Sequence, residues 1–544
     1  MVIDRRKREF LLFLMKTTGA FWLAKYFPIY GCSSGSSGTK SFDLNTFPQS
    51  VASGDVTQNS AVIWTRTSIA GTPIVCQVSE TEDFSSIVFN EVVTPTEDKD
   101  NTIKLKVQNL KPATRYYYRF LKDESSSPVG TFKTVDPKSE RIRFAFVSCQ
   151  DYTNGFYSAW YHLSQENLDF VIHLGDYIYE TTYEPSFQYA QLRRIDLTSG
   201  RKVALEKRDY WELYKVYKSD RYLQIAHEKF PFYIVWDDHE FANDSAYTLS
   251  PDNGKDFYGS EIQPQRRLIA SEAWDEYLPV DVYFDPKEQD PAKQIKIYRS
   301  FDLGPLARLI MTDERLYRSP QPCGTRGVGQ RYLAYCENVK NTTMLGEEQL
   351  DWFLKELKKA QDDGVIWKIH GNEVCMSQMM FVSSDGRKTF LNLDQWDGYS
   401  AERTKIFNYI VQNNIKNYFV VTGDFHTFVV AELYDDFQAS NPNRAGVEFA
   451  STSITSANLG TLLRMTEQTF QTIEETLIRS NKHLKFFNSR YHGYTVCELT
   501  PEEAIVELWR TSSTQEPEVE KTEKILVKKY RVKRDTNTIE DITP

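Results

Sequence analysis

Phe170-Val171-Ile172-His173-Leu174-Gly175-Asp176-Tyr177-Ile178-Tyr179-Glu180 is the most informative segment of this 544-residue chain. It starts as an apolar run and ends in a Gly-Asp turn followed by two phenols and a second carboxylate. A run this apolar predicts a strand buried on both faces, as in a sheet covered by helices. Functional groups in such folds lie at the carboxyl ends of the strands, which is where Asp176 and Tyr179 stand.

Three further apolar runs end in the same way. Residues 142–147 lead into Ser148-Cys149-Gln150, residues 232–236 into Asp237-Asp238-His239-Glu240, and residues 418–421 into Thr422-Gly423-Asp424-Phe425-His426. Helical patterns are readable at about 154–165, 264–276, 346–361 and 400–413. We therefore predict an α/β domain over residues 137–510, with the four strand ends meeting at one edge.

The side chains at these strand ends form a mixed ligand set. Asp176 can bridge two cations, and a phenolate such as that of Tyr179 favours ferric iron. Cys149 adds a thiolate and His426 an imidazole, and together these ligands suit a transition metal.

The remaining carboxylates supply hard oxygen ligands. Asp237, Asp238 and Asp424 are suited to one or two further ions of the calcium or magnesium type. His239 lies beside them in the sequence and can donate a proton to a leaving-group oxygen. Asp176 and His239 are therefore the predicted catalytic residues.

Composition limits the function classes. The chain has 65 Lys and Arg against 75 Asp and Glu, a net charge of −10, which excludes non-specific nucleic-acid binding by the bulk surface. Clustered cations would give such an acidic protein a local site for an anion, and they activate water for attack on phosphate esters. The pattern predicts attack of metal-bound hydroxide on a phosphate ester held between the ions.

The regions outside the α/β domain have simpler interpretations. Short β-rich runs over residues 45–136 predict an all-β sandwich of the fibronectin or immunoglobulin type, with a structural role. Residues 511–544 are a C-terminal extension with no catalytic role, and residues 525–527 are a candidate edge strand. Seven cysteines are too few for a disulfide scaffold. Cys323 and Cys336 are the one candidate pair, and they either form a disulfide or stay free.

The N-terminus has the pattern of an export signal over residues 1–32, with a basic head and a modest apolar middle. Lys7-Arg8-Glu9-Phe10-Leu11 resembles the twin-arginine consensus, and Ile29-Tyr30-Gly31-Cys32 resembles a lipobox followed by a flexible linker over 33–44. The prediction is a periplasmic or cell-surface protein with a candidate lipid anchor at Cys32. The alternative is ordinary signal cleavage, with Cys32 a bystander.

Taken together, the motifs resemble the PhoD-type alkaline phosphatases and phosphodiesterases of the calcineurin-like metallophosphatase superfamily. The resemblance covers residues 47–510 and also includes Val51-Ala52-Ser53-Gly54-Asp55, residues 272–279, 345–352 and 394–400. It implies a two-sheet sandwich flanked by helices, holding one ferric ion (Fe3+) and two calcium ions (Ca2+). It places Cys149, Asp176, Tyr179 and His426 on the iron. It places Asp238 and Asp424 on the other ions, with Asp176 bridging and Asp237 as a further candidate, and His239 facing the phosphate.

Several questions stay open at this point. A further metal ligand is expected, and His370, Asn372 and Glu373 are the candidates. A phosphate-binding arginine is also expected, with Arg193 and Arg194 among the candidates. Substrates include phosphate monoesters and diesters such as phospholipid head groups or wall polymers. The alternatives are a purple-acid-phosphatase-like monoesterase and a non-catalytic surface-binding lipoprotein.

Overall fold

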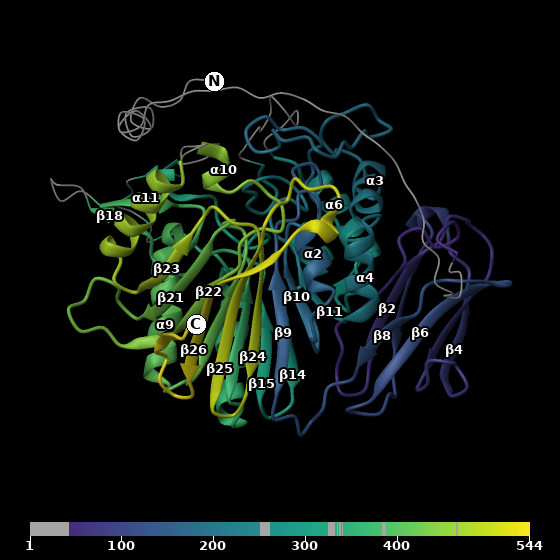
Figure 1. Cartoon of the computed structure of the whole chain (residues 1–544), viewed down its shortest axis with the longest axis horizontal. Helices are drawn as coiled ribbons and strands as arrows, with labels where there is room; N and C mark the ends of the chain where they lie inside the picture. The colour runs from purple at the N-terminus through teal and green to yellow at the C-terminus, as the bar shows by residue number, and fades with distance from the viewer. Residues whose placement is uncertain are drawn as a thin grey trace.

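The computed structural model describes residues 43–250, 262–324, 332–334, 336, 339, 341–382, 388–463 and 466–544. The predicted export signal, Cys32 and nearly all of the linker lie outside these residues. In the ranges described, every helix is too short or too polar to cross a membrane. The chain forms two β-rich bodies side by side, a large one and the smaller N-terminal one (Figure 1).

Among the described residues, the large body contains two large sheets and two small ones of two and three strands. Five strands of the first follow the order β25-β24-β9-β10-β11, in which β9, β10 and β11 are parallel. The second follows β14-β15-β17-β20-β22-β21-β23, in which β15, β17, β20 and β22 are parallel. The bounds are β9 Ile142–Val147, β10 Phe170–Leu174, β11 Phe232–Val235, β24 Gly493–Leu499, β25 Glu503–Thr511, β14 Arg299–Leu303, β15 Ala307–Met311, β17 Trp367–Asn372, β20 Tyr418–Thr422, β21 Phe428–Tyr434, β22 Arg444–Ala450 and β23 Leu484–Asn488.

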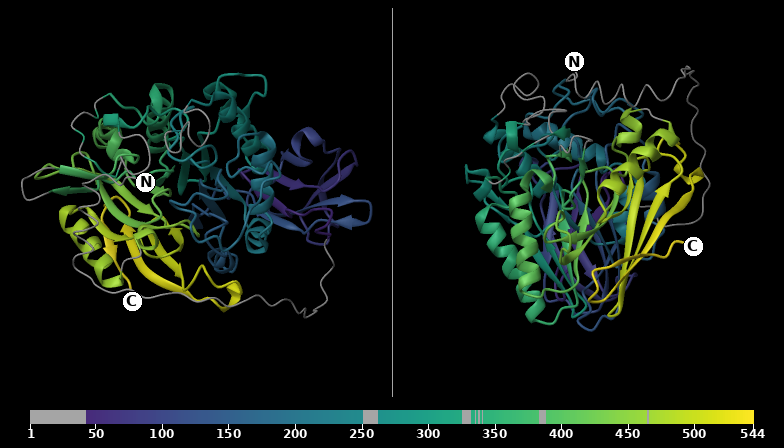
Figure 2. Two further views of the ribbon diagram at one scale, coloured as in Figure 1. Left: turned by 90° about the horizontal axis from the view of Figure 1, so that it is seen from above. Right: turned by 90° about the vertical axis from the view of Figure 1, so that its left-hand side faces the viewer.

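The two sheets pack face to face around one apolar core, which includes Phe146, Ile172, Leu309 and Phe419. Figure 2 shows the layers edge-on in its right-hand view, with green helices on one outer side and the yellow strands on the other. Helix α2 packs on β24 and β25 of the first sheet, and α4 packs on α2 and on β1 (Val51–Gly54) and β8 (Gly130–Lys133) of the N-terminal body. Helix α3 packs on α6, and α8 and α9 cover the second sheet. Their bounds are α2 Ser158–Leu163, α3 Lys207–Tyr217, α4 Arg221–Lys229, α6 Pro264–Tyr277, α8 Gly346–Asp362 and α9 Ser400–Gln412. This is the predicted α/β fold of two packed sheets flanked by helices.

The N-terminal body is an all-β sandwich with its own apolar core. Strands β1 Val51–Gly54, β2 Ala61–Arg66 and β5 Thr102–Val107 form one layer. The other layer contains β3 Ile74–Ser79, β4 Ile87–Val93, β6 Arg115–Lys122, β7 Ser125–Ser126 and β8 Gly130–Lys133. The predicted all-β domain is therefore present.

The two bodies share a sheet at one junction, where β1 pairs in parallel with β11. A Cβ at Gly54 would collide with the carbonyl oxygens of Pro279 and Phe232, so the close approach requires glycine. Asp55, the next residue, forms a two-point ion pair with Arg299 at 2.8 and 2.9 Å. The Val-Ala-Ser-Gly-Asp motif thus fixes the sandwich to the large body.

Two further features concern the C-terminus and the cysteines. Residues 511–544 add β26 (Lys524–Lys533) and β27 (Ile539–Asp541) to the edge of the first sheet, beside β25. The predicted edge strand at 525–527 is part of β26. Cys323 and Cys336 form a disulfide.

Candidate metal centre

The four motifs lie at the carboxyl ends of β9, β10, β11 and β20, on one edge of the two sheets. Cys149, Asp176, Asp424 and His426 all have left-handed backbone conformations, with φ between 50° and 60°. Such conformations are costly for residues other than glycine and persist only where the surrounding structure holds them. These four backbone conformations therefore cost free energy, and they turn the side chains toward a common point.

Gly175 brings two of the strand ends together. Its φ is +94°, and a Cβ there would overlap the backbone nitrogen and Cβ of Asp237. Glu240 also holds together the turns that follow β10 and β11. Its carboxylate accepts hydrogen bonds from the backbone N–H groups of Asp176 (3.0 Å), Tyr177 (2.7 Å) and Asp237 (2.8 Å).

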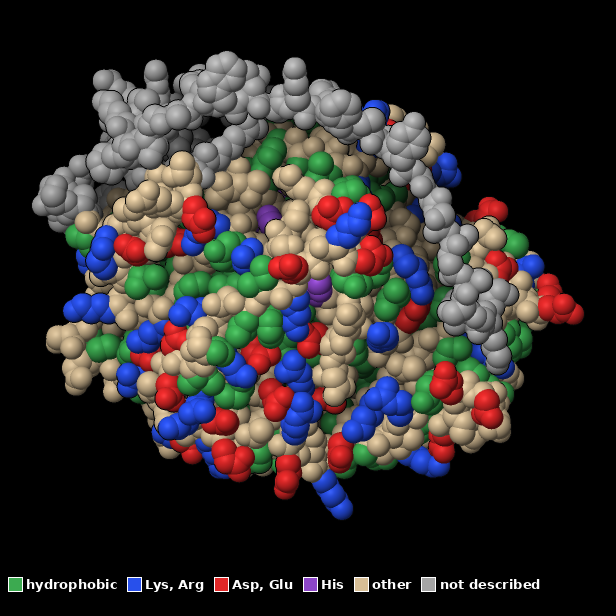
Figure 3. All heavy atoms as spheres, viewed as in Figure 1, with side chains coloured by type: hydrophobic (Ala, Val, Ile, Leu, Met, Phe, Trp, Pro, Cys, Tyr) green, Lys and Arg blue, Asp and Glu red, His purple; other side chains and the backbone are tan. Residues whose placement is uncertain are grey.

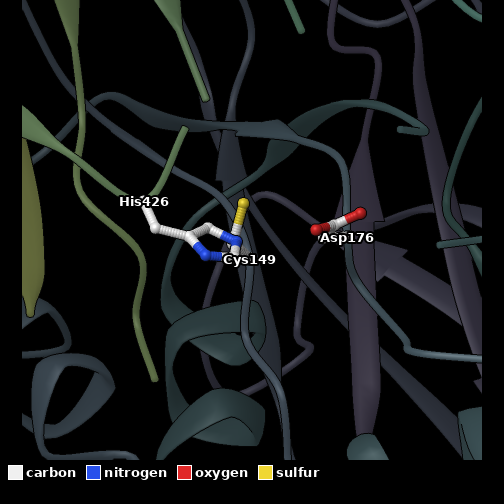
Figure 4. A group of neighbouring side chains, drawn as sticks. All are labelled: Cys149, Asp176 and His426. Atoms are coloured by element: carbon white, nitrogen blue, oxygen red, sulfur yellow. The ribbon is translucent and has the colours of Figure 1, made fainter. Parts of the chain in front are cut away.

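Within the described ranges, three groups of side chains can each hold a cation, because the ligand atoms of each group lie within 4.8 Å of one another. Figure 4 shows the first, with the sulfur of Cys149 beside the ring of His426 and the carboxylate of Asp176 opposite. The groups are Cys149, Asp176 and His426; Asp176, Asp238 and His239; and Asp237, Asp238 and Asp424. Asp176 belongs to two groups and so does Asp238, so the three candidate sites form one continuous row.

Tyr179 belongs to the first group by contact. Its hydroxyl donates to Asp176 Oδ2 at 2.7 Å and lies 3.3 Å from His426 Nε2. The Nδ1 of His426 is hydrogen-bonded to the carbonyl oxygen of Ala457 at 2.8 Å, which leaves Nε2 facing the group. A thiolate, a carboxylate, a phenolate and an imidazole can therefore meet at one ion.

His239 is held in a fixed orientation. Its Nδ1 lies 2.7 Å from Glu180 Oε2, and its ring stacks on that of Tyr179 with 4.0 Å between centroids. Burial disfavours the charged ring, but the carboxylates of Glu180, Asp238 and Asp176 outweigh burial and raise the pKa of His239 well above its usual value. With Nδ1 bound to Glu180, Nε2 is the nitrogen that remains for chemistry.

Arg315 lies among the carboxylates of the third group and is fully buried. Its guanidinium donates to Asp237 Oδ1, to Asp394 Oδ2 at 2.7 Å and to Asp424 Oδ1 at 2.6 Å. Asp424 Oδ2 also accepts from Gln395. This network orients the third group and supplies one positive charge to it.

The residues present fit bound cations, as three observations show. Asp237 Oδ2 and Asp238 Oδ1 are buried and have no hydrogen-bond partner among the described residues, although buried polar atoms are normally paired. Burial and the nearby carboxylates of Asp238, Glu240 and Asp424 raise the pKa of Asp176 well above its usual value, a repulsion that cations relieve. The first group also mixes sulfur, nitrogen and oxygen ligands, whereas the third is all oxygen, so the two ends suit different metals.

The open candidates from the sequence do not join these groups in the part of the chain described. His370 is hydrogen-bonded to Thr312 and Tyr418 at 2.7 Å each, and Asn372 to Trp396, Thr422 and Val374. Glu373 accepts from the backbone N–H of Glu314. Of the arginines, Arg193 stacks on Tyr152 and pairs with Asp220, and Arg194 is exposed and pairs with Asp196.

Sequence reasoning missed four residues that shape the site: Glu180, Glu240, Arg315 and Asp394. Glu180 and Glu240 are the last residues of the motifs at 175–180 and 236–240, but the sequence pattern gave them no predicted role. Arg315 follows β15 in the run Thr312-Asp313-Glu314-Arg315, a polar strand end like the other four, which was the available signal.

Comparisons with known proteins agree with this geometry. Residues 144–508 match the model of the PhoD-like phosphatase family, and residues 32–136 match its N-terminal domain. The chain is 31% identical to alkaline phosphatase D of Bacillus subtilis over 474 residues, which is 85% of this chain and 76% of that protein.

Solved structures show the same relationship. A structure of PhoD superposes with a TM-score of 0.79 at 28% identity, covering 93% of this chain and 94% of that one. A purple acid phosphatase from yellow lupin (Lupinus luteus) superposes with a TM-score of 0.52 at 11% identity, covering 90% and 75%, and shares the fold alone. The chain therefore belongs to the PhoD-like phosphatase family, as a hydrolase homologous to alkaline phosphatase D.

Proposed function

We propose that this phosphatase is an exported, metal-dependent enzyme that hydrolyses phosphate monoesters, phosphodiesters or both. The observation that carries the proposal is the row of three ligand groups linked by Asp176 and Asp238. Cations held in a row provide several positive charges at one edge of an acidic protein, where a phosphate can bind.

The proposed metals are one ferric ion and two calcium ions. Cys149, Asp176, Tyr179 and His426 would hold the iron, whose preference for phenolate and thiolate ligands this set matches. Asp237, Asp238 and Asp424, with Asp176 shared, would hold the calcium ions through oxygen. When bound, such ions neutralise phosphate oxygens and lower the pKa of water.

The chain's own residues then contribute orientation and a proton. His239, fixed by Glu180 at Nδ1, would hold a proton at Nε2 for the leaving-group oxygen. In this proposal the middle group therefore binds its ion through Asp176 and Asp238, without His239. Arg315 keeps Asp237 and Asp424 in place by donating to both. Glu240 holds the turns that carry Asp176 and Asp237, so that the ligand groups keep their spacing.

The test uses the purified protein, an exhaustive chelator and a monoester and a diester with the same leaving group. We expect activity on at least one ester to be lost on chelation and restored by iron with calcium, with an alkaline optimum. Full activity after metal removal would overturn the proposal. An acidic optimum restricted to monoesters would favour a purple-acid-phosphatase-like enzyme, and metal loading without hydrolysis of either ester would favour a binding lipoprotein.

We also propose export to the periplasm or cell surface, with a lipid anchor at Cys32. The support is the basic and apolar pattern of residues 1–32 and the lipobox-like run before Cys32. Phospholipid head groups or wall-polymer diesters would be accessible there. Replacing Cys32 by alanine should release the protein from the membrane fraction, and an unchanged membrane fraction would contradict the anchor.

A further inference from the structure

A pocket of about 230 Å³ lies beside the metal centre, between the loop after β22 and the end of β25. Fifteen residues line it, including Arg490 and Arg510, and no aspartate or glutamate is among them. Elsewhere, on the face shown in Figure 3, acidic and basic side chains are interspersed. A positive lining without acids is therefore a local feature of a protein whose net charge is −10.

The two arginines differ in their partners. Arg490 is paired with Glu474 at 3.0 Å and with Glu467 at 2.8 Å, so its charge is compensated. The side chain of Arg510 has no hydrogen bond or ion pair with the described residues, and its guanidinium lies over the ring of Tyr491, 4.5 Å from the centroid. Stacking on an aromatic ring orients a guanidinium but leaves its N–H groups free for an anion.

A second polar group is also unpaired at the pocket. Asn154 is 7% exposed, and its amide nitrogen donates to Phe187 O at 2.7 Å. Its Oδ1 is buried and has no hydrogen-bond partner in the described part of the chain. A buried carbonyl oxygen needs a donor, which a water or a hydroxyl group of a ligand can supply.

The pocket shares a wall with the metal centre. Ala457 lines the pocket, and its carbonyl oxygen accepts from Nδ1 of His426 at 2.8 Å. Thr455 also lines the pocket, and its backbone N–H donates to the carbonyl oxygen of Cys149 at 3.4 Å. Only the main chain around Ala457 and the side chain of His426 lie between the ligand groups and the pocket, a distance on the order of 10 Å.

We propose that this pocket binds a second anionic group of the substrate, a phosphate carried by the leaving group, with Arg510 as its main cationic contact. The inference rests on the proposed function and names a substrate class for it. Substrates with two phosphates separated by a short linker would be preferred over those with an uncharged leaving group, because only they neutralise Arg510.

The test compares hexanediol monophosphate with hexanediol bisphosphate, which differ only in the second phosphate. In the wild-type protein we expect the lower KM for the bisphosphate. In Arg510→Gln, KM for the bisphosphate should rise about tenfold, with kcat/KM for the monophosphate within about twofold of wild type. Arg534→Gln, an exposed arginine beside Asp535, is the matched control and should change neither substrate.

Direct binding separates this inference from the proposed activity. Calorimetric titration of hexanediol bisphosphate into the chelator-treated protein should show binding that Arg510→Gln weakens and Arg510→Lys partly restores. This result would stand even if the protein hydrolysed neither ester. Equal effects of Arg510→Gln on both substrates, or bisphosphate binding that is unchanged in the variant, would overturn the inference.

Discussion

At the scale of the residue, the contact between Glu180 and His239 gives a sharp prediction. Replacing Glu180 by glutamine keeps the size of the side chain but offers His239 Nδ1 an amide in place of a carboxylate. The imidazole ring of His239 then loses its carboxylate partner and is oriented less firmly toward the leaving-group oxygen. For this reason kcat should fall about 100-fold. The measurement is steady-state kinetics together with metal content, which should stay at the wild-type level.

The matched control for this variant is Glu212→Gln, because Glu212 lies on α3 and accepts a hydrogen bond at the surface from the backbone N–H of Thr198. It should retain full activity. A Glu180→Gln protein with wild-type kcat would show that catalysis does not need the Glu180 carboxylate to orient His239. Loss of the metals in this variant would show that Glu180 maintains the structure of the metal centre instead.

Tyr179 gives a spectroscopic prediction at the same scale. If its phenolate binds ferric iron, the protein should have a visible absorption band from phenolate-to-iron charge transfer, and Tyr179→Phe should lack it. Tyr177→Phe is the control, since the Tyr177 hydroxyl contacts His227 at 2.8 Å and Lys218 at 3.2 Å rather than the ligand group. A band that survives in Tyr179→Phe would exclude this residue as an iron ligand.

At the scale of the element, the end of α3 contains a buried lysine. Lys218 is the C-cap of α3, its amine donates to the hydroxyl of Tyr177, and it lies 4.4 Å from the ring centre of Trp64 in the N-terminal sandwich. Burial lowers the pKa of Lys218 to about 7. The helix end thus places a group with altered titration between the two bodies.

The sign of the pH effect follows from linkage. Between pH 7 and the ordinary lysine pKa near 10.4, the unfolded chain holds a proton that the folded chain has released. The free energy of unfolding of the wild type should therefore rise with pH relative to Lys218→Met, by up to about 1.4 kcal/mol per pH unit. Urea denaturation of both proteins at pH 7, 8 and 9 measures this; a constant difference would mean that Lys218 titrates normally.

Sequence patterns predicted four strands of the two large sheets and four helices: β9, β10, β11, β20, α2, α6, α8 and α9. The runs that became β9, β10, β11 and β20 are continuously apolar, and that signal depends only on local sequence. The helices α3 and α4 were not predicted. The buried face of α3 is built largely from Tyr210, Leu213, Tyr214 and Tyr217, and its capping box pairs Glu206 with Asp209 rather than starting with serine or threonine.

The candidate site was predictable where one motif carried its own chemistry, as in the turn of Asp176 and Tyr179. It was not predictable where a role depends on distant partners. Arg315 reaches Asp237, Asp394 and Asp424, which lie 78, 79 and 109 residues away in the chain. Only the packing of the two sheets brings these groups together.

At the scale of the whole molecule, the C-terminal extension completes the first sheet. Tyr530, Val532 and Ile539 are buried in the large core. Deleting residues 512–544 would remove this apolar surface and expose the edge of β25, and unpaired strand edges promote aggregation. We expect a lower unfolding temperature and aggregates by size-exclusion chromatography, and a folded, monomeric truncated protein of wild-type stability would contradict this view.

The account as a whole requires that Asp176 links two bound metals. The most direct measurement is elemental analysis of purified wild type, Asp176→Asn and the exposed control Asp436→Asn, each with its phosphatase rate. Wild type and control should carry iron and calcium, about one and two per chain, whereas Asp176→Asn should lose metal and activity together. An Asp176→Asn protein that keeps both metals and near-normal turnover would contradict the account.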